Sequence, residues 1–210
     1  GRSSASSMRP RSLPPHSPGL RIGLFGGSFN PPHAAHRSAS LLAMKRLRLD
    51  AVWWLVTPGN PLKDVRELPS LTDRIAAAEQ VANHPRIKVT GIEAVLHTRF
   101  SYDTVVALRH RCPGVRFVWV MGADNLPAFH RWKNWRGLAR LLPIVVVDRG
   151  GVGLRAVAAL APRALAGFRL PESAAAALPD CRPPAWVYLH GLKLTLSSTA
   201  LRGKISQPTR

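Results

Sequence analysis

The sequence has few cysteines and no long apolar segment. Cys112 and Cys181 are its two cysteines, far apart and outside any C-x-x-C pair. We therefore expect neither a disulfide framework nor a zinc site, and a reducing cytoplasm fits this usage. No apolar run approaches the roughly 18 residues of a membrane helix. The sequence thus predicts a cytoplasmic protein with no membrane partner.

Acidic residues are also scarce, with 11 Asp and Glu against 30 Lys and Arg and a net charge of +19. Such an excess can serve nucleic-acid binding, can steer anionic small substrates, or can reflect an arginine bias across a whole proteome. The arginines are scattered rather than gathered in one basic block, and no aromatic RNA-binding signature of the RRM type occurs. We favour the arginine bias and expect no nucleic-acid partner.

In other respects the composition is ordinary. The 210 residues are 46% hydrophobic and 20% charged, which suits one domain with a substantial core. Residues 1–19 differ, because they are rich in Ser, Pro and Arg and contain no acid. We predict that 1–19 is a disordered N-terminal extension or an expression remnant. Residues 20–210 then form a single domain.

The most informative stretch covers residues 22–36 and reads I-G-L-F-G-G-S-F-N-P-P-H-A-A-H. A short apolar run ends in the pair Gly26 and Gly27, passes two prolines, and restarts as a helical pattern from His33. This order predicts a strand, a tight turn and a helix. Glycines in the turn allow the backbone to approach a ligand. The N–H groups and dipole of the new helix favour phosphate.

His33 and His36 are three residues apart, so they share one face of the first helical turn if both are helical. Two imidazoles beside a phosphate can donate hydrogen bonds and stabilise charge that develops in a transition state. An isolated H-x-x-H is more often a pair of surface histidines. The order of strand, glycine pair, proline pair and H-x-x-H is far more specific.

The run G-G-S-F-N-P-P-H-A-A-H resembles the signature of the nucleotidylyltransferase superfamily, and its double glycine and two histidines resemble the bacterial nicotinate-nucleotide adenylyltransferases. The resemblance implies adenylyl transfer from ATP to nicotinate mononucleotide, giving deamido-NAD and pyrophosphate, with Mg²⁺ arriving on ATP. It implies that His36 stabilises the α-phosphoryl group and that His33 holds a neighbouring phosphate. The ATP-binding residues that it implies in this turn also include Gly26, Gly27, Ser28 and Phe29.

Further apolar runs predict strands at 51–56, 87–92, 115–121, 144–147 and 186–189. Helical patterns lie between them, among them a helix from Ser70 to about Asn83 and an Ala-rich helix over 153–165. Six strands that alternate with helices predict a parallel, doubly wound sheet of Rossmann-like type. In such sheets ligands bind at the carboxyl ends of the strands.

Two segments resemble the family's mononucleotide site. The loop after the second strand resembles a P-x-x-x-K segment, with Asn60 and Lys63 at the mononucleotide and Lys63 reaching a phosphate. We interpret Arg74, in the next helix, as a surface or interhelix residue. The segment R-F-S-Y-D-T-V resembles R-Y-T-x-D-T-L, which brings Ser101 and Asp103 to the pyridine carboxylate. Either side chain is also a candidate helix cap, and both roles are compatible.

Two tryptophans follow the fourth predicted strand. The resemblance implies that Trp132 stacks on the pyridine ring, as aromatic side chains do on flat heterocycles, whereas we predict that Trp135 belongs to the core. Gly122 and Asp124, just past the same strand, are implied at ATP. The acid there would bind a ribose hydroxyl or orient the loop.

The remaining ATP segments lie in the last third of the chain. Arg149 matches the family's A-R-P-G, but Asp148 and Gly150 depart from it and leave the phosphate contacts of this loop open. The run L-S-S-T-A-L-R resembles I-S-S-T-x-I-R. Its hydroxyls and guanidinium suit the β- and γ-phosphates, and its predicted ligands are Ser198, Thr199 and Arg202.

Two alternatives remain at this stage. The chain could be another adenylyltransferase of the superfamily, with nicotinamide mononucleotide or pantetheine phosphate as its acceptor. It could also be a basic RNA-binding protein on a nucleotide-binding fold, in which case binding would depend steeply on salt. Lys63 and Arg202 are assigned to the leaving pyrophosphate under the main hypothesis. The sequence leaves the oligomeric state open.

Overall fold

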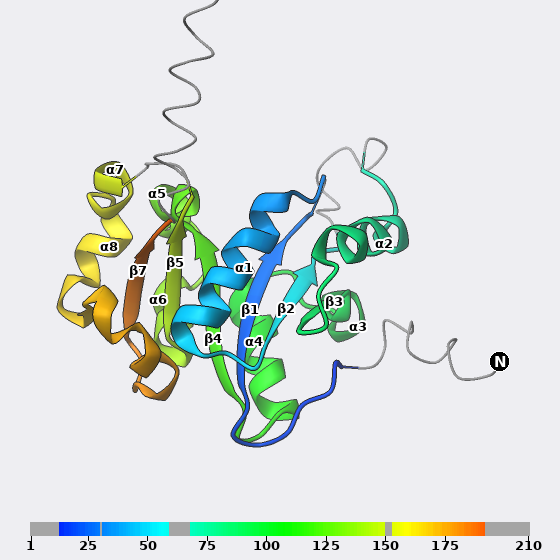
Figure 1. Cartoon of the computed structure of the whole chain (residues 1–210), viewed down its shortest axis with the longest axis horizontal. Helices are drawn as coiled ribbons and strands as arrows, with labels where there is room; N and C mark the ends of the chain where they lie inside the picture. Colours follow the sequence, from blue (N-terminus) through cyan, green and yellow to red (C-terminus); the bar gives the residue numbers. More distant parts are fainter. Residues whose placement is uncertain (1–12, 30, 59–67, 150–152, 192–210) are drawn as a thin grey trace, which may run out of the picture.

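The computed structural model describes residues 13–29, 31–58, 68–149 and 153–191. Seven parallel strands form one sheet in the order β3-β2-β1-β4-β5-β7-β6, which confirms the predicted doubly wound architecture (Figure 1). The strands are β1 (Arg21–Gly27), β2 (Ala51–Val56), β3 (Ile87–Thr90), β4 (Arg116–Gly122), β5 (Ile144–Asp148), β6 (Arg169–Leu170) and β7 (Trp186–His190).

Helices cover both faces of the sheet (Figure 1). One face carries α1 (Ala34–Leu47), α2 (Leu71–Ala82) and the 3-10 helix η4 (Glu172–Asp180). The other carries α3 (Ile92–Leu96), α4 (Ser101–Arg111), α5 (Leu126–Phe129), α6 (Trp135–Leu141), α7 (Gly153–Val157) and α8 (Leu160–Ala164). Short 3-10 turns, η2 (Ala123–Asn125) and η3 (Ala166–Phe168), complete the set of helical elements in the described chain.

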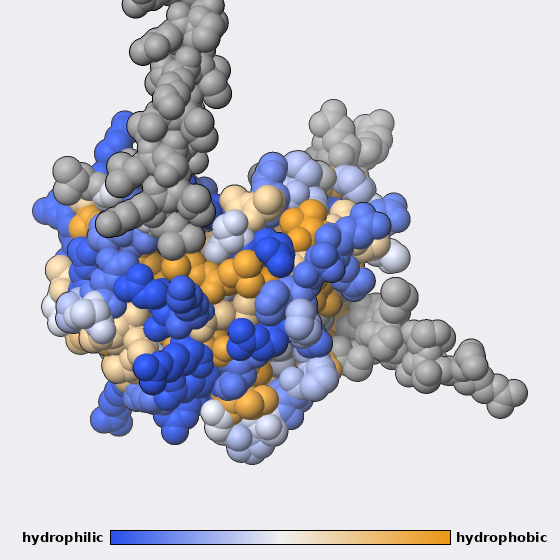
Figure 2. Space-filling view, viewed as in Figure 1, coloured by the Kyte–Doolittle hydropathy of each residue, from blue (hydrophilic) through white to orange (hydrophobic). Residues whose placement is uncertain are grey.

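Strand β2 is apolar throughout because both of its faces are buried. In β2, Trp53 packs into the core under α3 and α4, while its neighbour Trp54 packs into the core under α1 and α2. Both indoles are fully buried. This two-sided burial is what makes parallel strands read as continuous hydrophobic runs. Hydrophilic side chains are spread across the face that carries α1, with smaller apolar areas between them (Figure 2).

Three elements differ from the sequence prediction. The third strand ends at Thr90, and Ile92 opens the short helix α3 instead of ending the strand. The predicted helix over 153–165 is two helices, α7 and α8. Pro162 explains the break, since a proline is tolerated in the first turn of α8 but would clash with the carbonyl of Ala158 in a continuous helix. The two-residue strand β6 was not predicted.

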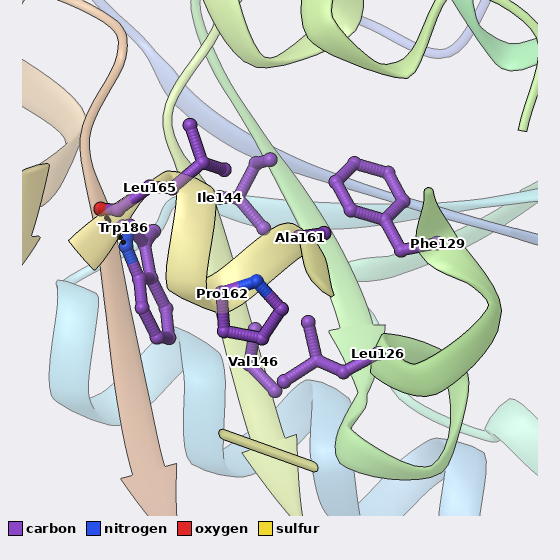
Figure 3. A pocket seen from close by; sticks show the side chains of 8 residues that line it. All are labelled: Leu126, Phe129, Ile144, Val146, Ala161, Pro162, Leu165 and Trp186. Carbon is purple, nitrogen blue, oxygen red and sulfur yellow. Dashed lines mark hydrogen bonds between the residues drawn. The ribbon is translucent and has the colours of Figure 1, made fainter. Parts of the chain in front are cut away.

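Helix α8 packs over β5 and β7 around a small apolar cavity of about 10 Å³, roughly the space of one water (Figure 3). The Trp186 indole N–H beside it donates to the Leu165 carbonyl at 2.8 Å, which leaves no polar group aimed at the cavity from that ring. We therefore interpret the cavity as a small gap in the packing of the core. Its lining residues are Leu126, Phe129, Ile144, Val146, Ala161, Pro162, Leu165 and Trp186.

The beginning of the described chain lies against the domain. Leu13 packs on the core, the His16 ring meets Trp53 edge-on with centroids 6.1 Å apart, and the Gly19 N–H donates to the Gly114 carbonyl at 2.8 Å. The predicted disorder of residues 1–19 therefore does not extend to 13–19, because apolar contacts hold that part in place. Residues 1–12 lie outside the described chain. No described helix is long and apolar enough to cross a membrane.

The strand order reverses between β1 and β4, because the chain winds one way from β1 to β3 and the other way from β4 onward. Crevices at such switch points, beyond the carboxyl ends of the strands, are where open parallel sheets bind ligands. The carboxyl edge, as we call the ends of β1, β2, β4 and β5 with the residues that follow them, is therefore the place to examine for a site.

Candidate active site

The turn from β1 into α1 is shaped by its own side chains as well as by glycine. A Cβ on Gly26 would lie 3.1 Å from the Trp119 ring of β4, so this glycine makes room for an indole of the core. The packing of Trp119 is therefore a structural reason for a glycine at position 26, beside the ligand role that the resemblance implies. Next in the turn, Phe29 is buried and has φ of 49°, in the left-handed region that bulky residues avoid.

His33 and His36 lie side by side at the start of α1, although only one of them is helical. His33 is the N-cap residue with an extended backbone, and α1 begins at Ala34. The two imidazoles are nevertheless nearly parallel, with centroids 5.8 Å apart. The His33 backbone N–H donates to Nδ1 of His36 at 3.0 Å. Since Nδ1 accepts, the neutral His36 ring carries its proton on Nε2, which is then a hydrogen-bond donor.

Aromatic rings surround His36 on its inner side. Centroids of Phe25, Phe29 and Trp54 lie 5.5, 4.9 and 6.0 Å from its ring. Burial lowers the pKa of His36 below its ordinary value, and the charges of Arg149 and His33 lower it further. The imidazole is therefore kept neutral at physiological pH, with one fixed donor. Such a group can hydrogen-bond an anionic oxygen without a change of its own charge.

Arg149, directly after β5, meets Asp124, which follows β4. Its Nη2 lies 3.4 Å from a carboxylate oxygen of Asp124, a long and partly exposed ion pair. A Cβ on Gly122 would lie 2.4 Å from that carboxylate and 2.9 Å from the guanidinium, so this glycine leaves room for the pair. Both charges act on His36. The structure thus brings predicted ATP residues from three strand ends together.

Asp148, which departs from the family pattern, faces inward. It is buried at the end of β5 and accepts hydrogen bonds from the Tyr188 hydroxyl at 2.7 Å and from the Gly153 N–H at 3.1 Å. Burial, and then this carboxylate, raise the pKa of Tyr188. The extra acid is therefore part of the support of the loop. Gly150 lies outside the described residues.

The start of α4 is open at its backbone. Phe100 is the N-cap residue and makes no side-chain cap bond, so neither Ser101 nor Asp103 caps the helix as one interpretation proposed. Ser101 is half-buried and Asp103 is exposed. The ammonium of Lys133 lies over the Phe100 ring, 4.6 Å from its centroid. The uncapped N–H groups and this cation together favour a negative charge at the helix start.

Beneath the start of α4 lies Glu93, which sequence reasoning missed. Its side chain is buried and accepts a hydrogen bond from the Thr104 hydroxyl at 2.9 Å, and Thr104 also contacts Thr98 at 2.8 Å. Burial raises the pKa of Glu93 to about 7. No sequence signal distinguishes this acid from a solvated one, because its burial depends on how α3 and α4 pack.

Trp132 is half-buried beside α5 and packs edge-on against two other rings. Phe129 lies 5.1 Å from it and Trp119 lies 6.1 Å from it, centroid to centroid. A partly open, firmly supported indole is suited to stack on a planar ligand. Trp135, by contrast, is buried and packs on Phe129, which confirms its predicted place in the core.

Arg74 contradicts our prediction of a surface or interhelix position. It is 2% exposed, and its guanidinium donates to backbone carbonyls next to β1, β2 and α2. Five predicted site residues lie outside the described residues. They are Asn60, Lys63, Ser198, Thr199 and Arg202.

The chain is similar to known proteins over most of its length. Residues 24–204 match the model of the cytidylyltransferase-like family. The chain is 59% identical to a curated "Probable nicotinate-nucleotide adenylyltransferase" of Bradyrhizobium sp. strain BTAi1, over 87% of this chain and 95% of that protein. It is 51% identical to the protein of the same name in Brucella suis, over 87% and 94% of the two chains.

The fold is also found in a solved structure, the Plasmodium falciparum nicotinic acid mononucleotide adenylyltransferase complexed with NaAD. The TM-score is 0.58 at 17% identity, over 84% of this chain and 78% of that one. At this identity the likeness shows the shared fold. The sequence relatives, which are far more similar and match over nearly their whole length, show the family. The chain belongs to the nicotinate-nucleotide adenylyltransferases, within the cytidylyltransferase-like family.

Proposed function

We propose that the carboxyl edge binds ATP and nicotinate mononucleotide together and joins them by in-line adenylyl transfer. A phosphate oxygen of the mononucleotide attacks the α-phosphorus of ATP, and a new P–O bond forms. The bond from the α-phosphorus to the bridging oxygen breaks, and pyrophosphate leaves with its electron pair. No side chain has to act as a nucleophile, so catalysis consists of positioning and charge stabilisation.

The observation that carries the proposal is the fixed donor on His36. Its Nδ1 accepts from the His33 N–H at 3.0 Å, so Nε2–H is available to an oxygen of the α-phosphoryl group. The lowered pKa of His36 keeps this arrangement intact near neutral pH, because protonation of Nδ1 would break the bond from His33. His33, exposed at the N-cap, is assigned to a neighbouring phosphate.

Arg149 supplies positive charge to the phosphates in this mechanism. Its ion pair with Asp124 is long, at 3.4 Å, so phosphate oxygens can compete for the guanidinium. This pairing supports the second of the two roles predicted for Asp124, that of orienting the loop. Ser28, the backbone of Phe29 and Gly122 complete the ATP surface that we propose in the described chain, while the Phe29 ring is buried.

The nicotinate ring is assigned to the space between the start of α4 and Trp132. The uncapped N–H groups at Ser101 and the Lys133 ammonium favour the pyridine carboxylate. Trp132 offers an indole face to the ring. Asp103 is exposed in the first turn of α4, and the assignment requires its carboxylate to point away from the pyridine carboxylate.

Mg²⁺ is proposed to enter with ATP, bound mainly to phosphate oxygens and water. Within the described chain, no group of three or more His, Cys, Asp or Glu side chains is arranged to hold a metal. The exposed Asp124 is the carboxylate at this edge that could reach a nucleotide-bound ion through water. When bound, the ion would neutralise charge on the phosphates.

Five further residues keep their assignments from the sequence alone. Asn60 and Lys63 are proposed at the mononucleotide and the departing phosphates. Ser198, Thr199 and Arg202 are proposed at the β- and γ-phosphates. We also retain the cytoplasm as the expected compartment, and no nucleic acid is needed as a partner.

A pyrophosphate-release assay with ATP and a panel of acceptors tests the proposal. Nicotinate mononucleotide should give rapid release and a dinucleotide product of the expected mass. Nicotinamide mononucleotide should be poorer, and pantetheine phosphate should be inactive. Release with pantetheine phosphate alone, or RNA binding that persists without ATP while no acceptor reacts, would overturn it.

A further inference from the structure

Arg74 is a buried cation that bonds only to the backbone within the described chain. Nε donates to the Pro69 carbonyl at 3.0 Å, Nη2 donates to Pro58 at 3.2 Å, and Nη1 donates to both Ser28 at 3.1 Å and Thr57 at 2.6 Å. Burial lowers the pKa of this guanidinium. A buried charge is costly unless its donors are satisfied, and here the carbonyls satisfy them.

One guanidinium nitrogen of Arg74 bonds to the residues that follow two neighbouring strands. Ser28 is the first residue after β1, and Thr57 is the first residue after β2. Both carbonyls converge on Nη1, and the Thr57 N–H donates to the Gly27 carbonyl at 3.0 Å. The guanidinium therefore fixes how the chain leaves two neighbouring parallel strands, at the edge where the site lies.

The Ser28 carbonyl belongs to the peptide plane that leads into Phe29. Phe29 has φ of 49°, and φ sets how that plane is turned relative to the Phe29 side chain. A bulky residue in this region is strained and persists only where its surroundings hold it. The bond from Arg74 to the Ser28 carbonyl fixes the backbone on one side of Phe29. The packing of the Phe29 ring fixes its side chain.

The Phe29 ring connects this backbone to His36. It is 2% exposed and stacks on Trp54 with centroids 5.0 Å apart and planes 18° apart. It also lies 4.9 Å from the His36 ring. A shift of Phe29 would therefore move one wall of the pocket that orients the imidazole.

We infer that Arg74 is a positioning residue for adenylyl transfer, which sets the direction of the His36 imidazole through the Ser28 carbonyl and the strained Phe29. Arg74 does not touch the substrates in this role. Its planar fork is what a lysine cannot reproduce, because an ammonium is a point charge that lacks the fixed array of donors. The inference rests on the proposed role of His36.

Arg74→Lys is the test, with Arg86→Lys as its matched control. Arg86 also donates to a backbone carbonyl, that of Leu49 at 3.3 Å, but at the amino end of β2. We expect Arg74→Lys to lower kcat about 10- to 100-fold through misplaced geometry. The KM for nicotinate mononucleotide should stay within about threefold, since the pyridine contacts are unchanged. Arg86→Lys should match the parent enzyme.

NMR titration of the His36 ring gives a readout that does not depend on activity. In the parent protein the pKa of His36 is lowered by burial. In Arg74→Lys it should rise toward the ordinary value, because the ring loses its packing on Phe29. A purely structural Arg74 would lower the melting temperature but leave kcat of the folded enzyme and this titration unmoved, which would overturn the inference.

Phe29→Gly keeps the inference testable if Arg74→Lys does not fold. Glycine adopts positive φ without strain and removes the ring, so this variant alone should show the same loss of kcat and the same shift in the His36 titration. In the double variant the two losses should be less than multiplicative. Multiplicative losses would mean that Arg74 acts by another route. If no variant or parent protein releases pyrophosphate, the proposed function fails, while the titration still decides the inference.

Discussion

The two edges of the sheet differ in how they hold several of their charged side chains. At the amino edge, Arg21 opens β1 and Arg116 opens β4, and both guanidiniums pair with the carboxylate of Asp180 at the end of η4. The Asp180 side chain is 42% exposed. These are surface ion pairs, in which water and salt weaken the attraction.

At or next to the carboxyl edge, three ionisable side chains are buried and bond to neutral groups, although the Arg149–Asp124 pair at that edge is partly exposed. Arg74 is held by backbone carbonyls, Asp148 by the Tyr188 hydroxyl and a backbone N–H, and Glu93 by the Thr104 hydroxyl. Such groups are expensive to bury, and the removal of a partner leaves a polar atom unsatisfied. They contribute fixed geometry more than net attraction.

This difference between the two edges indicates where the exact position of a side chain matters for function. Surface pairs at the amino edge tolerate small displacements of their long side chains. Buried hydrogen bonds at the carboxyl edge do not, and that edge carries the residues assigned to adenylyl transfer. Substitutions at the two edges should therefore differ in kind, with effects on rate and specificity at one edge and small effects on stability at the other.

The largest effect is expected for His36→Ala, which removes the fixed Nε2–H donor. Loss of one preorganised donor typically costs about 10²–10³ in kcat. Pyrophosphate release under saturating substrates measures it. His36→Gln, which keeps an N–H donor in the side chain, should recover part of the rate. Near-normal turnover of His36→Ala, with unfolding unchanged, would remove His36 from the mechanism.

A smaller factor is expected for the choice of acid over amide. The N–H groups at the start of α4 and the Lys133 ammonium can bond a carboxylate, whereas an amide would turn its own N–H₂ toward donors. Unpaired donors of this kind cost about 1–3 kcal/mol each. The ratio of kcat/KM for nicotinate and nicotinamide mononucleotides should therefore favour the acid about tenfold or more.

Lys133→Met sharpens this comparison, since it removes the cation and leaves the helix start in place. The ratio should fall severalfold while the KM for ATP is unchanged. A parent ratio near one, or one that favours the amide, would contradict the assignment of the pyridine site. The adenylyl-transfer chemistry would stand.

Trp132→Ala should raise the KM for the mononucleotide about tenfold and leave that for ATP nearly unchanged, because the indole face is assigned to the pyridine ring alone. Initial rates with each substrate varied in turn measure both constants. Trp132→Phe, which keeps a ring, is the matched variant and should lose less. Equal effects on both constants, or a loss of folding, would place Trp132 in the core.

Sequence reasoning succeeded where the information is local. Runs such as 51–56 are apolar at every position because both faces of the strand are buried, and the turn from Gly26 to His36 combines residues within one short segment. Both features can be read without knowing what packs on them. The sheet and the start of α1 were therefore predictable.

It failed where a residue takes its role from distant parts of the chain. Arg74 looks like any helical arginine until the carbonyls of Ser28 and Thr57 are seen to converge on it. Glu93 looks solvated until α4 covers it, and the room that Gly26 leaves for Trp119 is visible only in the folded sheet. Packing across the sheet decides these cases, and no short pattern records it.

Glu93→Gln tests the buried carboxyl through stability. Because the pKa of Glu93 in the folded state is raised to about 7, folding favours its protonated form, and stability is lost as pH rises through that value. The parent protein should lose roughly 1 kcal/mol between pH 6 and pH 8 relative to Glu93→Gln. Urea unfolding across this range measures it. The exposed Glu79→Gln is the control. Parallel pH profiles for the parent and Glu93→Gln would mean that Glu93 is not buried in this way.

The smallest effect is expected for Asp180→Asn at the amino edge. Its pairs with Arg21 and Arg116 are exposed, and such pairs are worth about 0–1 kcal/mol. The loss of unfolding free energy should stay below about 1 kcal/mol and shrink further in 1 M salt, where the screening length is about 3 Å. The rate of pyrophosphate release should not change, since the pair lies at the end of the sheet opposite the site.

Asp148→Leu is the companion variant at the carboxyl edge. It replaces the carboxylate oxygen that accepts from both Tyr188 and Gly153 by methyl groups of similar size that cannot accept. A buried mismatch of this kind costs about 1–3 kcal/mol and does not respond to salt. Because Arg149 is the next residue, the change should also raise the KM for ATP. If Asp180→Asn proved the more damaging of the two, or if salt weakened both variants alike, the contrast between the two edges would be wrong.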